Sequence, residues 1–117
     1  YVRSRPKGHG LENMIEGHVT PGLKLVVVED LISTGGSSIK AALALREVGF
    51  KVLGLASIFT YGFNASEQNF TNANIPFFSL TNYEELLKVA LNNGDISEND
   101  LEYLQDWRKN PADWGSR

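Results

Sequence analysis

Two adjacent carboxylates, Glu29 and Asp30, stand between an apolar run and a loop of small residues. The apolar run, Leu25 to Val28, predicts a buried strand, and residues 33–37, Ser-Thr-Gly-Gly-Ser, lead into a helical stretch. The backbone N–H groups of such a loop, together with the N-terminus of the helix, attract a phosphate group. Carboxylates just upstream are suited to accept hydrogen bonds from sugar hydroxyls or to hold the water shell of a metal ion. The segment therefore predicts a sugar-phosphate site at the carboxyl end of a parallel strand.

The loop at 33–38 matches neither of the two best-known phosphate loops. A Walker A loop needs Gly-x-x-x-x-Gly-Lys-Ser/Thr, and no lysine follows the glycines here. A dinucleotide-binding loop needs Gly-x-Gly-x-x-Gly, which these residues do not supply. Two alternatives remain at this point: a different sugar-phosphate loop, or an ordinary strand–turn–helix connection with two acids beside it by chance.

Four basic residues alternate near the N-terminus: Arg3, Arg5, Lys7 and His9. In an extended segment this spacing places all four side chains on one side. Cations that close over a leaving pyrophosphate would stabilise the transition state more than the ground state, and the neighbouring glycines would let the loop open and close. A solvated basic turn is the alternative, but the phosphate loop farther along the chain favours a functional role.

The order of apolar and periodic segments predicts an α/β fold, in one domain or the larger part of one. Residues 25–59 read as strand, helix and strand, which implies a right-handed parallel crossover with ligands bound outside the carboxyl ends of the strands. In that helix, Ile39, Ala42 and Leu43 mark the apolar face. The expected strands are 1–3, 25–29, 51–59 and 76–80. The expected helices are 36–48, 65–73, 82–92 with Asn82 as its cap, and a last helix that Ser97 caps and Pro111 bounds. A long mobile loop or loose hairpin is expected over 4–22.

The composition excludes several classes of protein. At 117 residues, with 42% hydrophobic and 21% charged residues, the chain resembles one small globular domain. Zero cysteines exclude a disulfide framework and thiolate chemistry, and no apolar run approaches the roughly 20 residues of a membrane span. We therefore expect a cytoplasmic protein with no membrane partner. A net charge of −3 argues against a nucleic-acid surface, whereas the basic segment 3–9 favours a small anionic ligand.

The phosphate loop and the basic segment together resemble one enzyme family. A strand, two acids, two further residues and Thr/Ser-x-Gly-x-Thr/Ser resemble the phosphoribosyl pyrophosphate (PRPP) motif of type I phosphoribosyltransferases. With Arg3-x-Arg5-x-Lys7-x-His9-Gly10 added, the pattern closely resembles orotate phosphoribosyltransferase, and residues 58–61 and 80–83 resemble one bacterial branch of it. The resemblance spans nearly the whole chain. It implies the Rossmann-like, parallel-sheet fold of type I phosphoribosyltransferases, with residues 1–117 as the C-terminal part of a single domain.

The resemblance also implies a reaction: transfer of ribose 5-phosphate from PRPP to orotate, giving orotidine 5′-monophosphate and pyrophosphate in pyrimidine biosynthesis. Mg²⁺ would be required and would be carried by PRPP, with water bridges to Glu29 and Asp30. These two acids would engage the ribose hydroxyls, residues 33–37 the 5′-phosphate, and Ser33 also orotate. The implied PRPP-binding residues are Arg3, Lys7, His9, Glu29, Asp30, Leu31, Ile32, Ser33, Thr34, Gly35, Gly36 and Ser37.

The basic loop carries the catalytic expectation. Lys7 and His9 are the implied catalytic residues, and the loop at 3–9 would reach the active site of the other subunit of a homodimer. Two positions depart from the family: Gly8 stands where many relatives have aspartate, and residues 60–62, Thr-Tyr-Gly, stand where some branches place an orotate-binding arginine. We carry over no such arginine.

The first residues of the chain predict a segment upstream of them. Tyr1-Val2-Arg3 reads as the tail of a strand already under way, so we expect an upstream portion and predict that residues 1–117 alone are inactive.

Two functions are the alternatives to orotate phosphoribosyltransferase: a salvage phosphoribosyltransferase for another base and a non-catalytic PRPP-sensing regulator. Trp107 and Trp114 are interpreted as C-terminal packing or a subunit contact rather than as a ligand-stacking pair.

Overall fold

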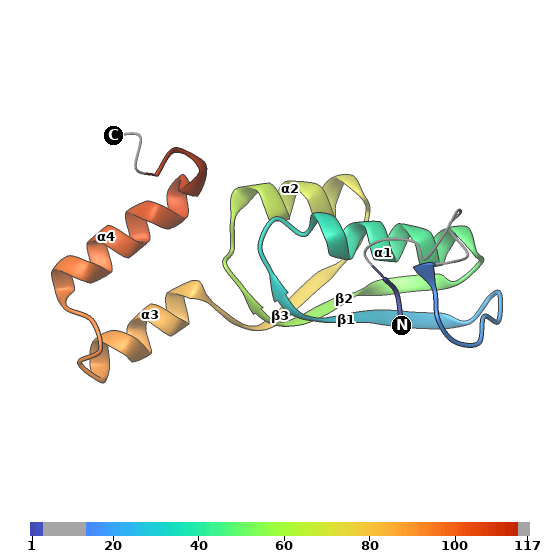
Figure 1. Ribbon diagram of the computed structural model, residues 1–117, viewed down its shortest axis with the longest axis horizontal. Coiled ribbons are helices and arrows are strands. Elements are labelled where there is room, and N and C mark those ends of the chain that lie inside the picture. The colour runs from blue at the N-terminus through green and yellow to red at the C-terminus, as the bar shows by residue number, and fades with distance from the viewer. Residues whose placement is uncertain (4–13, 115–117) are drawn as a thin grey trace.

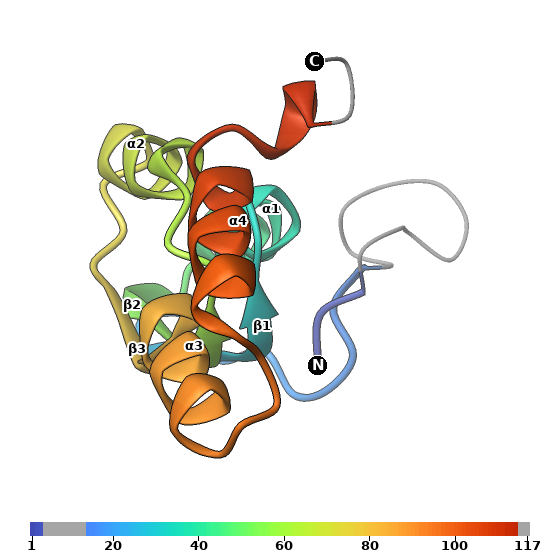
Figure 2. The same cartoon turned by 90° about the vertical axis from the view of Figure 1, so that its left-hand side faces the viewer.

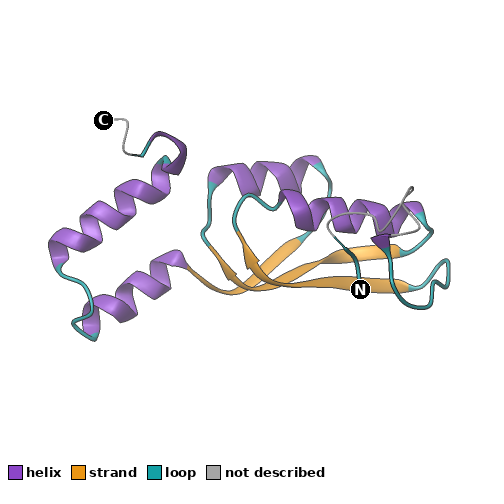
Figure 3. Ribbon diagram, viewed as in Figure 1, coloured by secondary structure: helices purple, strands orange, loops and turns teal. Residues whose placement is uncertain are grey.

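The computed structural model describes residues 1–3 and 14–114. Three strands alternate with two helices, and two further helices follow (Figures 1 and 3). The elements are β1 (Lys24–Ile32), α1 (Gly36–Glu47), β2 (Lys51–Thr60), α2 (Asn64–Asn72), β3 (Phe77–Asn82), α3 (Tyr83–Asn92), α4 (Glu98–Lys109) and a short 3-10 helix at Pro111–Asp113. These bounds confirm the expected order of elements from residue 24 onward, with β1 longer than predicted at both ends.

The three strands form one sheet in the order β1-β2-β3, and both pairs are parallel. In register, Ile32 pairs with Thr60 and Thr60 with Asn82, so all three strands end at one edge, here called the carboxyl edge. Helices α1 and α2 lie side by side over one face of the sheet (Figures 1 and 2). The predicted α/β fold with a parallel sheet is confirmed, and the expected sugar-phosphate loop follows β1 at the carboxyl edge.

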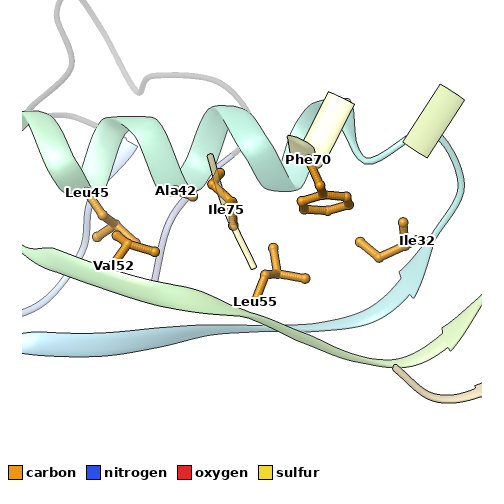
Figure 4. Close-up of a cluster of buried hydrophobic side chains, with 7 residues drawn as sticks. All are labelled: Ile32, Ala42, Leu45, Val52, Leu55, Phe70 and Ile75. Carbon is orange, nitrogen blue, oxygen red and sulfur yellow. The ribbon is translucent and has the colours of Figure 1, made fainter. Parts of the chain in front are cut away.

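A small core fills the space between the sheet and α1 and α2 (Figure 4). Burying an aliphatic side chain contributes about 1.5–3 kcal/mol, so this layer holds the two helices on the sheet. Leu43 was predicted on the apolar face of α1 but is 45% exposed, while Leu45 is buried. The face of α1 that packs on the core consists of Ile39, Ala42 and Leu45. Leu43 lies about 100° around the helix from Ala42 and therefore falls outside this face. The buried cluster is Ile32, Ala42, Leu45, Val52, Leu55, Phe70 and Ile75.

The opposite face of the sheet is apolar and open. Successive side chains of a strand point to opposite faces, so residues that alternate with the core side chains emerge here. Val28 is 76% exposed and Leu80 71% exposed. Among the described residues no helix covers this face (Figure 1). The large apolar side chains exposed on the strands are Val26, Val28, Leu31, Leu53, Ile58, Phe78 and Leu80.

Helices α3 and α4 continue beyond the carboxyl edge (Figure 1). The predicted caps are confirmed: Asn82 Oδ1 accepts from the Glu85 N–H at 3.0 Å, and Ser97 Oγ accepts from the Asp100 N–H at 3.1 Å. The Ser97 N–H in turn donates to Asp100 Oδ2 at 2.9 Å, which completes a capping box. These two hydrogen bonds hold the pKa of Asp100 below its usual value. In each helix, therefore, one N–H group of the first turn is bonded to the side chain of the N-cap residue.

The N-terminal residues differ from the expected strand at 1–3. In the part of the chain that the structure describes, Val2 forms an isolated antiparallel bridge with Ile15. The expected loop at 4–22 is described only from Met14 onward, where Met14 is buried and His18 is exposed. Within 1–3 and 14–114, no helix has the length and apolar character needed to cross a membrane.

Candidate functional site

The connection between β1 and α1 forms the predicted loop at the carboxyl edge. Asp30 Oδ1 accepts a hydrogen bond from the Leu31 N–H at 2.8 Å, which fixes the carboxylate at the end of the strand. Gly35, the N-cap of α1, has φ +83°, a left-handed conformation that favours glycine. The Gly36 N–H lies 3.5 Å from Thr34 Oγ1. The chain thus turns tightly from a carboxylate-bearing strand into a helix.

The N-terminus of α1 differs from those of α3 and α4. Gly35 has no side chain with which to cap the helix, whereas Asn82 and Ser97 cap the later helices. The first N–H groups of a helix have no partner within the helix and carry the positive end of its dipole. At α1 the Gly36 N–H faces Thr34 Oγ1, while no described contact takes the Ser37 and Ser38 N–H groups, which are left for another acceptor. An anion the size of a phosphate is the ligand that this geometry binds best.

Helix α2 holds the loop from behind. Asn69 Nδ2 donates to the Thr34 carbonyl at 3.0 Å. Phe70 is buried against Gly35, where an added Cβ would come within 2.7 Å of the ring. Sequence reasoning missed both contacts, because Asn69 lies 35 residues from Thr34 along the chain. They lock the middle of the loop to a rigid helix, which suits a site that must hold its ligand in one geometry.

The turn after β2, residues 60–63, lies beside the loop. The Tyr61 N–H donates to the Ile32 carbonyl at 3.2 Å, so the turn is bonded to the residue just before Ser33. The Gly62 N–H donates to Thr60 Oγ1 at 3.1 Å. A cavity of about 280 Å³ opens next to this turn, at the ends of β2 and β3. Its lining residues include Thr60, Gly62, Glu67, Asn82, Glu84 and Arg108.

An aromatic cluster joins α4 to this turn. The Tyr61 and Phe63 rings stack 5.2 Å apart, and Trp107 meets both edge-on at 5.7 Å. Tyr83 packs 5.6 Å from Trp107, and burial raises the pKa of its phenol above 10.0. Arg108 Nη1 donates to the Gly62 carbonyl at 3.1 Å. The predicted packing role of the C-terminal tryptophans is confirmed, because Trp107 packs here and Trp114 packs on Tyr103.

The structure gathers one half of the predicted site. Residues 29–37 lie together at the carboxyl edge, with Leu31 and Ile32 inside β1 and Ser33 to Ser37 forming the loop and the first turn of α1. Glu29 also lines a cavity of about 510 Å³ between β1 and the N-terminal residues. Arg3 forms an ion pair with Glu16, and no described contact joins it to the loop. The predicted residues Lys7 and His9, with Arg5 and Gly8, lie outside the described residues.

The acidic residues of the site do not form a metal cage. In the stretches 1–3 and 14–114, no three Asp, Glu or His side chains come together as metal ligands. Glu29 and Asp30 are the acids at the end of β1, and one oxygen of Asp30 already accepts a backbone hydrogen bond. Two carboxylates with free oxygens suit a metal ion that arrives with its own ligand and keeps much of its water shell, as Mg²⁺ does.

The sequence is similar to orotate phosphoribosyltransferases. No family model matches the chain. The enzyme of Bacteroides thetaiotaomicron is 59% identical over 114 residues and that of Cytophaga hutchinsonii 57% identical over 114 residues. Each alignment covers 97% of this chain and 54% of the relative. The chain therefore spans about half the length of the curated relatives it matches.

Solved structures of orotate phosphoribosyltransferases are similar to the fold of this chain. The orotate phosphoribosyltransferase of Aeropyrum pernix superposes with a TM-score of 0.65 at 31% identity, over 75% of this chain and 49% of that one. The Mycobacterium tuberculosis enzyme in complex with PRPP superposes with a TM-score of 0.53 at 28% identity, over 59% and 42%. The fold is that of type I phosphoribosyltransferases, and the chain is related to orotate phosphoribosyltransferases along about half of their length.

Proposed function

We propose that this chain supplies the PRPP-binding edge of an orotate phosphoribosyltransferase. One observation carries the proposal: two carboxylates lie near the carboxyl end of a parallel strand, and the loop after that strand leads into a helix whose N-terminus has no side-chain cap. This arrangement occurs in a chain that is 59% identical to a named orotate phosphoribosyltransferase. A relative of the same name was solved in complex with PRPP.

The roles of the edge follow from its chemistry. Glu29 and Asp30 accept hydrogen bonds from the ribose hydroxyls, and residues 33–37 surround the 5′-phosphate with their N–H groups. Ser33, at the start of the loop, contacts orotate. In the reaction the orotate nitrogen attacks ribose C1, the C1–O bond to pyrophosphate breaks, and the nitrogen's proton is lost to solvent. The positive charge that develops on the ribose needs no protein nucleophile, so the edge acts by binding and orienting.

The basic loop completes the proposal. Lys7 and His9 neutralise the pyrophosphate as it leaves, and Arg3 assists them by exchanging its ion pair with Glu16 for the ligand. In this proposal the protein is a homodimer and the loop at 3–9 serves the site of the partner subunit. The loop excludes water that would hydrolyse the activated ribose. The cytoplasm remains the predicted compartment, on the cysteine-free composition.

Mg²⁺ is the cofactor in this proposal. When bound to PRPP, it supplies positive charge that stabilises the pyrophosphate leaving group. Glu29 and Asp30 would hold its water shell rather than ligate it directly, which fits the described residues around them. Their negative charge also favours the ribose cation that develops nearby.

The test is consumption of orotate by the complete gene product, followed by ultraviolet absorbance with PRPP and Mg²⁺. Hypoxanthine and uracil are run in parallel as competing bases. The proposal predicts loss of orotate alone and release of one pyrophosphate for each orotate consumed. Turnover of another base would assign the chain to salvage, and PRPP binding without turnover of any base would assign it to a non-catalytic regulator; either result would contradict the proposal.

A further inference from the structure

Arg108, in the last turn of α4, contacts the carboxyl edge from a distant part of the sequence. Its Nη1 donates to the Gly62 carbonyl at 3.1 Å, across 46 residues. Gly62 has φ +70°, and an added Cβ there would lie 3.8 Å from the same nitrogen. The guanidinium is therefore bonded to a turn that only a glycine adopts readily. Nothing in the sequence motif of the phosphate loop assigns a role to this arginine.

A series of contacts connects Arg108 to the phosphate loop. The residue before Gly62 donates its N–H to the Ile32 carbonyl at 3.2 Å, directly before the loop begins. The residue after Gly62 is Phe63, the N-cap of α2. Asn69 of α2 then donates to the Thr34 carbonyl at 3.0 Å. The turn that Arg108 holds is thus bonded to the start of the loop and also fixes the start of the helix behind it.

We propose that Arg108 is a positioning residue for the PRPP loop, acting through the turn at 60–63. The inference rests on the proposed function for the identity of the ligand, but the contacts that carry it are within the described fold. Trp107 supports the same turn from the neighbouring position by packing on Tyr61 and Phe63. Helices α3 and α4 are in this way part of the binding edge, although they contribute no residue to the loop itself.

A matched control exists within the same chain. Arg46 also uses its guanidinium to bond backbone carbonyls, those of Ala73 and Asn74 at 3.0 Å, at the opposite edge of the sheet. Replacing it removes more backbone hydrogen bonds than replacing Arg108 does, but at the other edge of the sheet from the phosphate loop. A merely structural role for Arg108 would make Arg108→Ala and Arg46→Ala behave alike. If Arg108 positions the PRPP loop, only Arg108→Ala should disturb the turn at 60–63 and the binding of PRPP.

The first measurement is hydrogen exchange on the complete gene product without ligand. Arg108→Ala should speed exchange of the Tyr61 N–H about fivefold or more, because the turn that carries this N–H is no longer held in place. Arg108→Lys, which can still donate to Gly62, should restore most of the protection. Arg46→Ala should leave this N–H unchanged. Equal exchange in the wild type and in Arg108→Ala would overturn the inference, whatever the ligand proves to be.

The second measurement is the dissociation constant of PRPP with Mg²⁺, by calorimetry, beside the KM for orotate. Arg108→Ala should weaken PRPP about fivefold, with little change in the KM for orotate, and Arg46→Ala should bind PRPP like the wild type. A rise in the KM for orotate alone would make Arg108 a substrate contact and contradict the positioning role. A wild type that binds no PRPP would overturn the proposed function, while the exchange experiment would still decide the role of Arg108.

Discussion

Both edges of the sheet are held by an arginine that donates to backbone carbonyls, yet the two edges leave different groups unsatisfied. At the amino edge, Arg46 bonds the carbonyls of Val52, Ala73 and Asn74, which joins α1 to the start of β2 and to the C-terminal end of α2. At the carboxyl edge, Arg108 bonds a single carbonyl beside an open cavity.

The contrast extends to the helices. The C-terminus of α1 at the amino edge is closed by backbone hydrogen bonds from Val48 and Gly49, whereas its N-terminus at the carboxyl edge has no side-chain cap. Unsatisfied helix donors cost free energy unless a ligand or water takes them. The satisfied groups at the amino edge therefore stabilise the fold, whereas the unsatisfied groups at the carboxyl edge are available to a ligand. Substitutions at matched positions on the two edges should therefore separate loss of folding from loss of ligand.

The largest difference is expected between two glycines with positive φ. Gly35→Ala would force a Cβ to within 2.7 Å of Phe70 in a left-handed backbone, so the loop must shift. We expect PRPP to bind about a hundredfold more weakly or not at all, measured by calorimetry. Gly22, at the amino edge, has φ +89° with nothing within 4 Å of an added Cβ. Gly22→Ala should lower the melting temperature slightly and leave the affinity for PRPP intact; equal losses in the two variants would refute the contrast.

The next largest effect concerns charge at the end of β1. Asp30→Asn keeps an oxygen that can accept from the Leu31 N–H but removes the negative charge, so the fold should survive. PRPP with Mg²⁺ should bind roughly tenfold more weakly, since a charged hydrogen bond contributes about 1.5–3 kcal/mol. The control is Glu47→Gln, an exposed acid at the other end of α1. An unchanged affinity in Asp30→Asn would show that this carboxylate does not meet the ligand.

Arg46→Ala sharpens the comparison from the amino edge. Its three hydrogen bonds to carbonyls are partly buried or exposed, and their loss should lower the free energy of unfolding by about 2 kcal/mol, measured by chemical denaturation. Affinity for PRPP should stay within about twofold of the wild type. A large loss of affinity in Arg46→Ala would mean that the two edges are coupled and that stability and binding are not divided between them.

The smallest effect is a dependence on alkaline pH. Burial raises the pKa of Tyr83 above 10.0, so the folded chain favours the neutral phenol. Its contribution to stability is fully present below pH 10.0 and is lost as the pH rises through the higher folded-state pKa. Denaturation from about pH 9 to about pH 11 should show a loss that Tyr83→Phe reduces. The same change at Tyr103, which is 61% exposed, should leave the profile as it is.

How much of this could be predicted depends on distance along the chain. The loop and its carboxylates were predicted because the strand, the acids and the helix start are contiguous, so the pattern contains the geometry. The supports of the loop were not: Asn69 lies 35 residues from Thr34, and Arg108 lies 46 residues from Gly62. Neither residue type is unusual on a helix surface. Only the packing of α2 and α4 on the carboxyl edge gives them a role.

The open face of the sheet marks another limit. Val28 and Leu80 read as ordinary buried strand residues, and in a parallel sheet with helices on both faces they would be buried. They are 76% and 71% exposed here. Alternation along a strand predicts two apolar faces but not which of them the described helices cover, and two helices of this length cover only one.

The most direct test of the central claim is hydrogen exchange of the complete gene product with and without PRPP and Mg²⁺. The carboxyl edge, residues 30–37 and 60–63, should gain protection on binding, while the amino edge, residues 20–24 and 46–52, should not change. Protection confined to the amino edge, or no change at either edge at saturating PRPP, would contradict the account.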